Sequence, residues 1–418
     1  MEVKKEDILQ QLDHPARLEQ LYRADKSAFR RAFREAYVES EGHPVARTWH
    51  ERLEYVSESS ITWGSASEWW RIILICLVSG TLAKLPDMFS MNESLFFERN
   101  TTFLVFPFLV IYFSWKNGYR LNKLLTIAAL FVAATVYMNA LPVRAGSDTI
   151  VLALIFMPIF AWSLLGFAFS GKGGYDHRNR LDFLKYNGDF FVMSGILLLS
   201  FGLFSALTIG LFHVVGVDIE KYYSDYFAIY CVFAAPLIGT HLVRTNPQLV
   251  NKVSPVIAKV FTPLLLLTLV GYLIAFAVSD KDPYNDRDFL FNFNMLLLGV
   301  MAIVFFSVAE IAHGESSRFS GWSLFLLSLT SVVVNVVATS AIAYRLFTMG
   351  ITPNRLVVTG SNLLLLSSAT VLTARLFAAL KENKKMEAVP YGITLFLPAI
   401  GVWAFIVACI FPLLFGYR

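Results

Sequence analysis

Charged residues are scarce in this 418-residue chain. They make up only 16% of it, whereas a soluble globular domain carries about 25%. Hydrophobic residues reach 56%, and the mean hydropathy is +0.57. This balance excludes an ordinary soluble protein, and the small net charge of +4 gives no indication of nucleic acid as a partner. The composition indicates a protein whose partner is the lipid bilayer.

Cysteine and catalytic motifs are also lacking. The three cysteines, Cys76, Cys231 and Cys409, fall in separate apolar runs, so we expect small buried side chains rather than disulfides or a zinc site. The chain has no nucleophile elbow, no HExxH motif and no Rossmann fingerprint. We therefore predict no catalytic residue, no metal and no cofactor.

Long apolar runs stand where charges are missing. Lipid offers no hydrogen-bond partners, so each run must be a helix that satisfies its own backbone, and the alternation typical of a barrel strand is missing. The sequence predicts an all-α polytopic membrane domain over residues 69–418 with about eleven transmembrane helices. The expected spans are 69–86, 101–115, 124–142, 148–170, 190–216, 223–243, 254–278, 288–312, 321–347, 355–378 and 390–415.

Residues 1–68 have a different pattern. In "LDHPARLEQLYRADKSAFRRAFREAYVES" apolar residues recur at intervals of three, four and seven, which is typical of amphipathic helices with a charged outer face. We expect a small helical domain that lies in the cytoplasm and offers a surface to a soluble partner protein. Its polarity also means that the first apolar run has to act as the insertion signal.

Lysine and arginine indicate the orientation. They are concentrated in the connections on the same side as residues 1–68 and are sparser in the others. Because cytoplasmic loops carry the excess of positive charge, this bias predicts a cytoplasmic N-terminus and, with an odd number of spans, a C-terminus on the opposite side.

Polar residues interrupt the late apolar stretch "SVVVNVVATSAIAYRLFTMGITPNRLVV", residues 331–358. Arg345 and Arg355 flank a turn at the outer surface, where we expect them to hold an anionic lipid or solute. Asn335 lies roughly 15 Å deeper than Arg345 at the helical rise, and we expect a Ser, Thr or Asn of another span as its partner.

Other polar residues fall in the eighth span. Glu310 and His313 are three positions apart and share a helix face, which suits either a proton relay or a hydrated helix end paired with Arg318. Asn292 and Asn294 stand at the start of this span, where capping is the favoured interpretation.

The same late stretch carries a resemblance to a known family. "RLFTMGITPNRL" resembles the signature of a bacterial inner-membrane family catalogued as domain of unknown function 4153, with "LVSGTLAKLPDMF" and "DPYNDRDFLFNFNMLLLG" similar to other parts of it. The positions that match the signature are Arg345, Gly350, Thr352, Pro353, Asn354 and Arg355; Ile351 stands where leucine is commoner. The resemblance implies a multi-pass protein of the bacterial inner membrane and no established activity.

Three functions remain open from the sequence. The leading hypothesis is a non-enzymatic protein that acts in transport or as a membrane sensor. A membrane transferase for lipid-linked substrates is the first alternative, and its marker would be Asp, Glu or His residues converging beside a lipid-sized cleft. The polar loop 171–189 is the inner connection that suits it. The second alternative is a scaffold that recruits a soluble partner through residues 1–68.

Overall fold

The described chain is helical throughout. The computed structural model describes residues 5–24, 26–40, 42–54, 64–118, 121–144, 146–171, 174–214, 216–278, 284, 287–313, 318–381 and 389–418. Within these ranges there is no strand. The chain divides into two compact units, Met1–Thr62 and Trp63–Arg418.

The N-terminal unit has its own apolar core. It consists of four short helices, α1 (Lys5–Gln10), α2 (Pro15–Ala24), α3 (Lys26–Ser40) and α4 (Pro44–Glu54). Proline opens α2 and α4, where its missing N–H costs nothing. Phe29 and Phe33 are fully buried, and the ring of Trp49 packs 5.1 Å from that of Phe29. An aromatic core therefore holds this small unit together.

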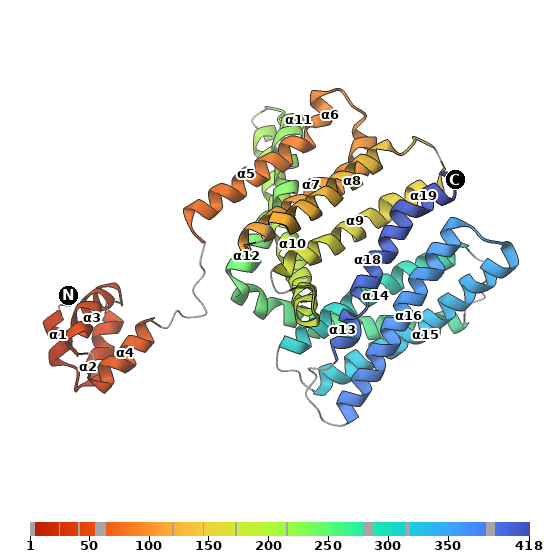
Figure 1. The fold of residues 1–418 in the computed structure, drawn as a ribbon. Helices are drawn as coiled ribbons and strands as arrows, with labels where there is room; N and C mark the ends of the chain where they lie inside the picture. The colour runs from red at the N-terminus through yellow and green to blue at the C-terminus, as the bar shows by residue number, and fades with distance from the viewer. Residues whose placement is uncertain are drawn as a thin grey trace. The chain divides into compact units, whose positions relative to one another are not determined.

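The second unit contains the long helices (Figure 1). In chain order they are α5 (Ala66–Ala83), α6 (Leu85–Met88), α7 (Glu93–Lys116), α8 (Leu121–Ala140), α9 (Asp148–Phe169), α10 (His177–Val214), α11 (Glu220–Tyr222), the π-helix η2 (Tyr223–Ala228), α12 (Ile229–Thr245), α13 (Pro247–Val278), α14 (Arg287–His313), α15 (Arg318–Met349), α16 (Pro353–Lys381), α17 (Tyr391–Thr394), α18 (Leu397–Phe405), the π-helix η4 (Ile406–Ile410) and α19 (Phe411–Leu414).

Ten helices in the described part of the chain are long and apolar enough to cross a membrane. A further apolar stretch, Asn294–Glu310 of α14, is shorter, so the count of eleven spans stays a prediction. Large apolar side chains face outwards along the unit, for example Leu199 with 77% exposure. Helices that bond their own backbone while exposing apolar side chains suit lipid as the surrounding solvent. The unit is therefore of the multi-pass membrane type.

α7 begins well before the apolar pattern indicates. The expected span 101–115 is only the later part of α7, because Asn92 caps an earlier start and Arg99 is satisfied inside the protein. Arg99 donates to the backbone carbonyls of Asn139 (3.1 Å) and Pro142 (3.2 Å). A polar residue that finds partners on a neighbouring helix does not end its own helix.

α10 also begins early, so that most of the expected polar loop 171–189 is helix. α10 begins at His177, and its first turns bury Phe183, Tyr186 and Asp189 against neighbouring helices. The expectation of a loop there was wrong, because these buried residues recur at helical spacing between the charged ones.

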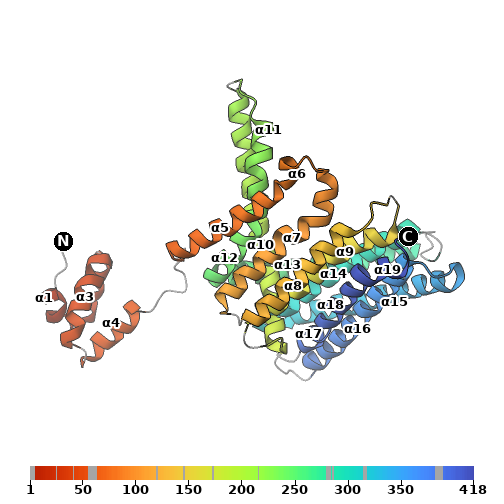
Figure 2. The ribbon, with the colours of Figure 1, turned by 45° about the horizontal axis from the view of Figure 1, so that its top comes forward.

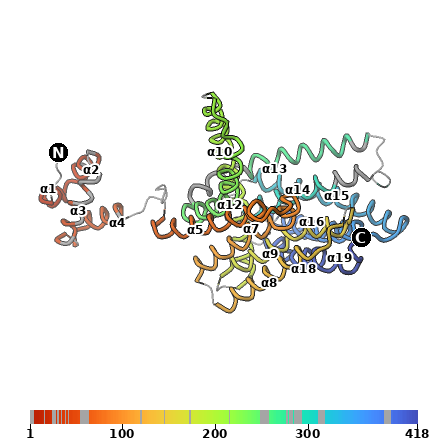
Figure 3. Tube along the Cα trace, turned by 90° about the horizontal axis from the view of Figure 1, so that it is seen from above, coloured from red at the N-terminus to blue at the C-terminus, as the bar shows by residue number. Residues whose placement is uncertain are grey.

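The helices pack in two groups. α12 packs against both α5 and α10, whereas α13, α14, α15 and α16 form a second group; α9 packs against α7, α18 and η4. Figures 2 and 3 show that the later part of α10 projects with α11 beyond the neighbouring helices.

Candidate functional site

Asn335 lies fully buried in the middle of α15. With its amide oriented to satisfy both groups, its oxygen accepts from the Leu366 N–H (3.1 Å) and its nitrogen donates to the Asn362 carbonyl (3.3 Å). The side chain of Asn362 in turn donates to Asn294 Oδ1 (2.9 Å). Asn335 therefore finds its partners on α16, and hydrogen bonds of asparagine connect α14, α15 and α16.

Asn294 does not cap its helix, so the capping interpretation was wrong for this residue. It lies inside α14, more than one turn after the helix begins at Arg287, and bonds Asn362 across to α16. A capping side chain serves only the first turn. Asn294 therefore contributes to the contact between helices.

Arg355 lies in the first turn of α16 and satisfies the end of α15. Its Nη1 donates to the carbonyls of Met349 (2.7 Å) and Gly350 (2.6 Å), and Gly350 has the positive φ of +83° that ends many helices. Among the described residues, the buried Nε of Arg345 has no hydrogen-bond partner. At the turn between α15 and α16, the guanidinium of Arg355 thus stabilises the helix end, whereas the Nε donor of Arg345 is available for another group.

Glu310 is buried near the end of α14, with 5% exposure. His313 is the last residue of α14, and its side chain lies outside the described residues. Glu310 is sixteen positions after Asn294, which is roughly 24 Å along the helix. Because Asn294 belongs to the asparagine contacts, Glu310 lies far from Asn335, and the predicted residues do not form one cluster.

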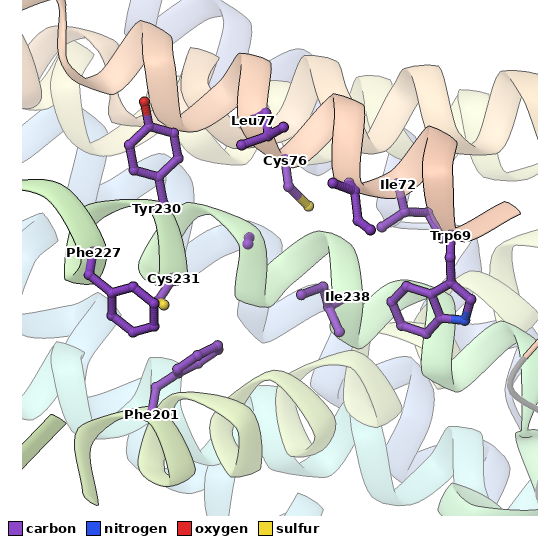
Figure 4. Close-up of a pocket in the computed structure, with 11 residues that line it drawn as sticks. Trp69, Ile72, Cys76, Leu77, Phe201, Phe227, Tyr230, Cys231 and Ile238 are labelled. Atoms are coloured by element: carbon purple, nitrogen blue, oxygen red, sulfur yellow. The ribbon is translucent and has the colours of Figure 1, made fainter. Parts of the chain in front are cut away.

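A cleft lies elsewhere, between α5, α10 and α12 (Figure 4). Its volume is about 190 Å³, and its exposed lining is wholly apolar. Water finds no hydrogen-bond partner on such a lining, whereas a hydrocarbon chain needs none. The residues that line it are Trp69, Ile72, Ile73, Cys76, Leu77, Phe201, Phe227, Tyr230, Cys231, Ala234 and Ile238.

Helical spacing places this lining on one face of each helix. On α5 the lining residues lie three, four, seven and eight positions after Trp69, which is one face of an α-helix. The ring of Tyr230 is seated against Gly80, where a Cβ atom would come within 2.2 Å of it. The Tyr230 hydroxyl also lies 3.2 Å from Thr81 Oγ1. Gly80 and Thr81 together fix the ring that forms one end of the cleft.

Polar groups stand at the other end, beside Trp69. The ring of His241 meets the Trp69 ring edge-on at 5.0 Å and is fully buried. Its Nδ1 lies 3.3 Å from the hydroxyl of Tyr112. Lys116 donates to Glu68 at 2.5 Å in the first turn of α5. The apolar cleft therefore ends at a group of titratable side chains.

Lys84 and Asp87 form an ion pair beyond the Tyr230 end. Burial lowers the pKa of the Lys84 ammonium, but the hydrogen bond and charge of Asp87, with the charge of Asp225, outweigh burial and raise the pKa overall. The hydrogen bond from Lys84 lowers the pKa of Asp87. The ammonium also lies 4.8 Å from the centre of the Tyr226 ring. Beyond Tyr230, the positive charge of Lys84 is thus balanced by the negative charge of Asp87.

Sequence reasoning missed the cleft. Its lining consists of apolar and aromatic residues, which look the same in a sequence whether they face lipid, a neighbouring helix or a cavity. A partial signal was present in Trp69, which begins the first apolar run at an expected membrane interface.

The chain matches no protein-family model, no curated protein and no solved structure. The resemblance to domain of unknown function 4153 therefore stays a prediction, and function has to be argued from the geometry.

Proposed function

We propose that this protein binds the hydrocarbon chain of a membrane lipid in the cleft between α5, α10 and α12, and that it acts in transport or as a membrane sensor. The proposal places it in the bacterial inner membrane, with the N-terminus in the cytoplasm and the C-terminus in the periplasm. The observation that carries it is the wholly apolar lining of a cleft between helices of membrane type.

The physical setting favours exchange of the occupant. A lipid chain in the bilayer is already in an apolar medium, so entering the cleft gains packing contacts and little from the hydrophobic effect. Binding that depends on fit alone is modest and reversible. Reversible occupancy suits a carrier or a sensor of lipid, and it requires no chemistry.

Filling the cleft tests the proposal. Ala234 lines the cleft from α12, so Ala234→Phe occupies space that a lipid chain would take. Ala133 on α8 is exposed and lies outside the cleft, so Ala133→Phe is the matched control. A phospholipid with a photoreactive group in its acyl chain is reconstituted with each variant, and labelled peptides are mapped by mass spectrometry.

We expect labelling of α5 and α12 peptides in the wild type and in Ala133→Phe, with a severalfold reduction in Ala234→Phe. Equal labelling of these peptides in all three proteins would remove the cleft as the binding site.

A membrane enzyme for lipid-linked substrates is the second candidate. It is favoured by Glu68 and His241, which stand beside Trp69 at the end of a cleft that suits a lipid chain. His241→Gln separates the two: a transferase loses a lipid product in cell extracts while cleft labelling continues, whereas a carrier or sensor shows no change in lipid composition.

The turn between α15 and α16 is proposed as a separate anion site. The donor left on Arg345 supports it, and an anionic lipid or solute would supply the acceptor. Glu310 and His313 stay proposed as a proton relay near the end of α14. The N-terminal unit is proposed as the surface for a cytoplasmic partner.

A further inference from the structure

The wall of the cleft is in direct contact with a buried histidine. The ring of Trp69, which lines the cleft, meets the ring of His241 edge-on at 5.0 Å. The side chain of His241 is fully buried. On α12 it follows Ile238, another lining residue, by three positions and so lies on the same side of the helix. A change at His241 therefore acts directly on residues that form the cleft.

The imidazole of His241 has an uncharged neighbour on one side and a charged one on the other. Its Nδ1 lies 3.3 Å from the hydroxyl of Tyr112, which is buried in α7. A Cβ atom on Gly64 would lie 3.2 Å from Nε2 and 2.7 Å from Oε2 of Glu68, so both atoms approach the same point of the backbone. The charges of Glu68 and His241 accordingly interact. Protonation of the ring therefore changes its interactions on the Gly64 side.

A proton can reach the buried ring from the same side. Gly64 is exposed and has a φ of +76°, which glycine adopts without strain. The side chain of Glu68 is 26% exposed, so a carboxylate in contact with water adjoins the imidazole. Histidine and glutamate are side chains that commonly transfer protons in proteins. The burial of His241 thus does not isolate it from the pH of the surrounding water.

Titratable and charged side chains from the neighbouring helices stand around His241. Among the described residues they are Glu68 on α5, Tyr112 and Lys116 on α7, Tyr186 on α10 and Arg244 on α12. Tyrosine is ordinarily uncharged at neutral pH. Lys116 already holds the carboxylate of Glu68 in an ion pair. A protonated His241 would share this one negative charge with Lys116.

Protonation adds an attraction between α5 and α12. An imidazolium donates from both ring nitrogens, and Nε2 is the nitrogen on the side of the Glu68 carboxylate. Glu68 lies in the first turn of α5, directly before Trp69. Drawing this turn towards α12 moves the Trp69 ring with it and narrows the part of the cleft that this ring lines.

We infer that His241 is a pH-sensitive switch of the cleft: on gaining a proton it draws the start of α5 towards α12 through Glu68, and the lipid chain is released. The inference rests on the proposed lipid binding and adds its regulation. Histidine suits this role because it ordinarily changes its charge between pH 5 and 8, where lysine and arginine keep theirs.

The pH dependence of cleft labelling tests the switch. The probe is a photoreactive phosphocholine lipid, whose headgroup keeps the same net charge throughout, and labelled α5 and α12 peptides are measured in vesicles between about pH 8 and about pH 5. We expect wild-type labelling to fall severalfold as the pH falls. His241→Gln keeps a hydrogen-bonding side chain that cannot be protonated, so its labelling should not change with pH.

His213→Gln is the matched control, because it removes an exposed histidine in the last turn of α10 that does not line the cleft. It should show the wild-type profile. Glu68→Gln is a second variant of the switch, in which glutamine can still complete the capping box of α5 but carries no charge. Because a neighbouring negative charge favours the protonated ring, the decline should then move to a lower pH.

The outcomes separate the switch from the binding itself. Wild-type labelling that stays constant or rises as the pH falls overturns the inference while lipid binding stands. The same decline in His241→Gln, or an unmoved decline in Glu68→Gln, overturns it as well. Absence of cleft labelling at every pH overturns the proposed function.

Discussion

The helices around the cleft and the helices α14 to α16 are held together in different ways. α14, α15 and α16 share asparagine hydrogen bonds, and the hydroxyls of Ser328 and Thr373 meet at 2.7 Å between α15 and α16. α5 and α12 approach through Gly80 against Tyr230 and leave an apolar space beside that contact. In both groups polar side chains join neighbouring helices, as Thr81 and Tyr230 do between α5 and α12, whereas apolar side chains line the space that a ligand can enter.

The largest effect is expected from Gly80→Ala, in the cleft group. The added methyl group would lie 2.2 Å from the Tyr230 ring, so the ring has to shift from its place at the end of the cleft, at a cost of about 1–3 kcal/mol from overpacking. We expect a lower apparent melting temperature in detergent together with weaker photolabelling of the cleft. Gly202→Ala in α10 is the control, because nothing lies within 4 Å of its added Cβ. Equal behaviour of the two variants would contradict the close contact.

Asn335→Leu tests the other group. The substitution removes hydrogen bonds between α15 and α16 and should lower the free energy of unfolding by about 0.6 to 1.7 kcal/mol. Cleft labelling should stay at the wild-type level, because the change lies in the other helix group. Asn122→Leu, at an exposed position of α8, should change neither measurement. A loss of labelling in Asn335→Leu would show that the two groups are coupled.

The two arginines of the turn between α15 and α16 should differ. Arg355→Gln removes donors to two helix-end carbonyls and should cost about 0.5–1.5 kcal/mol of stability, read from thermal unfolding. Arg345→Gln should leave the stability close to that of the wild type. If Arg345 holds an anion, the same variant should lose the protein's activity in cells. Two stable variants with full activity would end the proposal of an anion site there.

The smallest effect is a pH dependence confined to the cleft group. The pKa of Asp87 is lowered, so its pairing with Lys84 stabilises the folded state above the ordinary carboxyl pKa and is lost as pH falls below about 4. The pKa of Lys84 is raised, so its contribution is lost only as pH rises above about 10. Neutral amides of the asparagine contacts do not titrate. In acid unfolding followed by circular dichroism, Asp87→Asn should therefore reduce the pH dependence, whereas Asn335→Leu should leave its slope unchanged.

The helices were predictable from the sequence because lipid enforces an apolar composition over a fixed length. That Asn335 bonds another helix was also predictable, since a buried amide in a span needs a partner there, but its partners on α16 are backbone groups of Asn362 and Leu366 rather than the expected polar side chain. The early starts of α7 and α10 were hidden because hydropathy reads Arg99 and Asp182 as loop residues. Whether such residues continue a helix depends on tertiary partners, which a sequence does not contain.

The cleft was beyond prediction for a related reason. Cys76 and Cys231 were expected to be small buried side chains. A cysteine in an apolar run suits a packed core and the wall of a cavity equally well, and these two line the cleft. Which apolar residue faces a cavity depends on how α5, α10 and α12 cross. That crossing is set by contacts such as Gly80 against Tyr230, between residues far apart in the chain.

The positions of the three cysteines allow spin labels to be attached at native residues. Cys76 and Cys231 direct their sulfur atoms towards the cleft, whereas Cys409 lies in η4 (Figure 4). Replacing Cys409 by serine leaves two native attachment points for a nitroxide, one on each of the helices that face each other there. Electron paramagnetic resonance can then measure the distance between the two nitroxides and so the separation of α5 and α12 across the cleft.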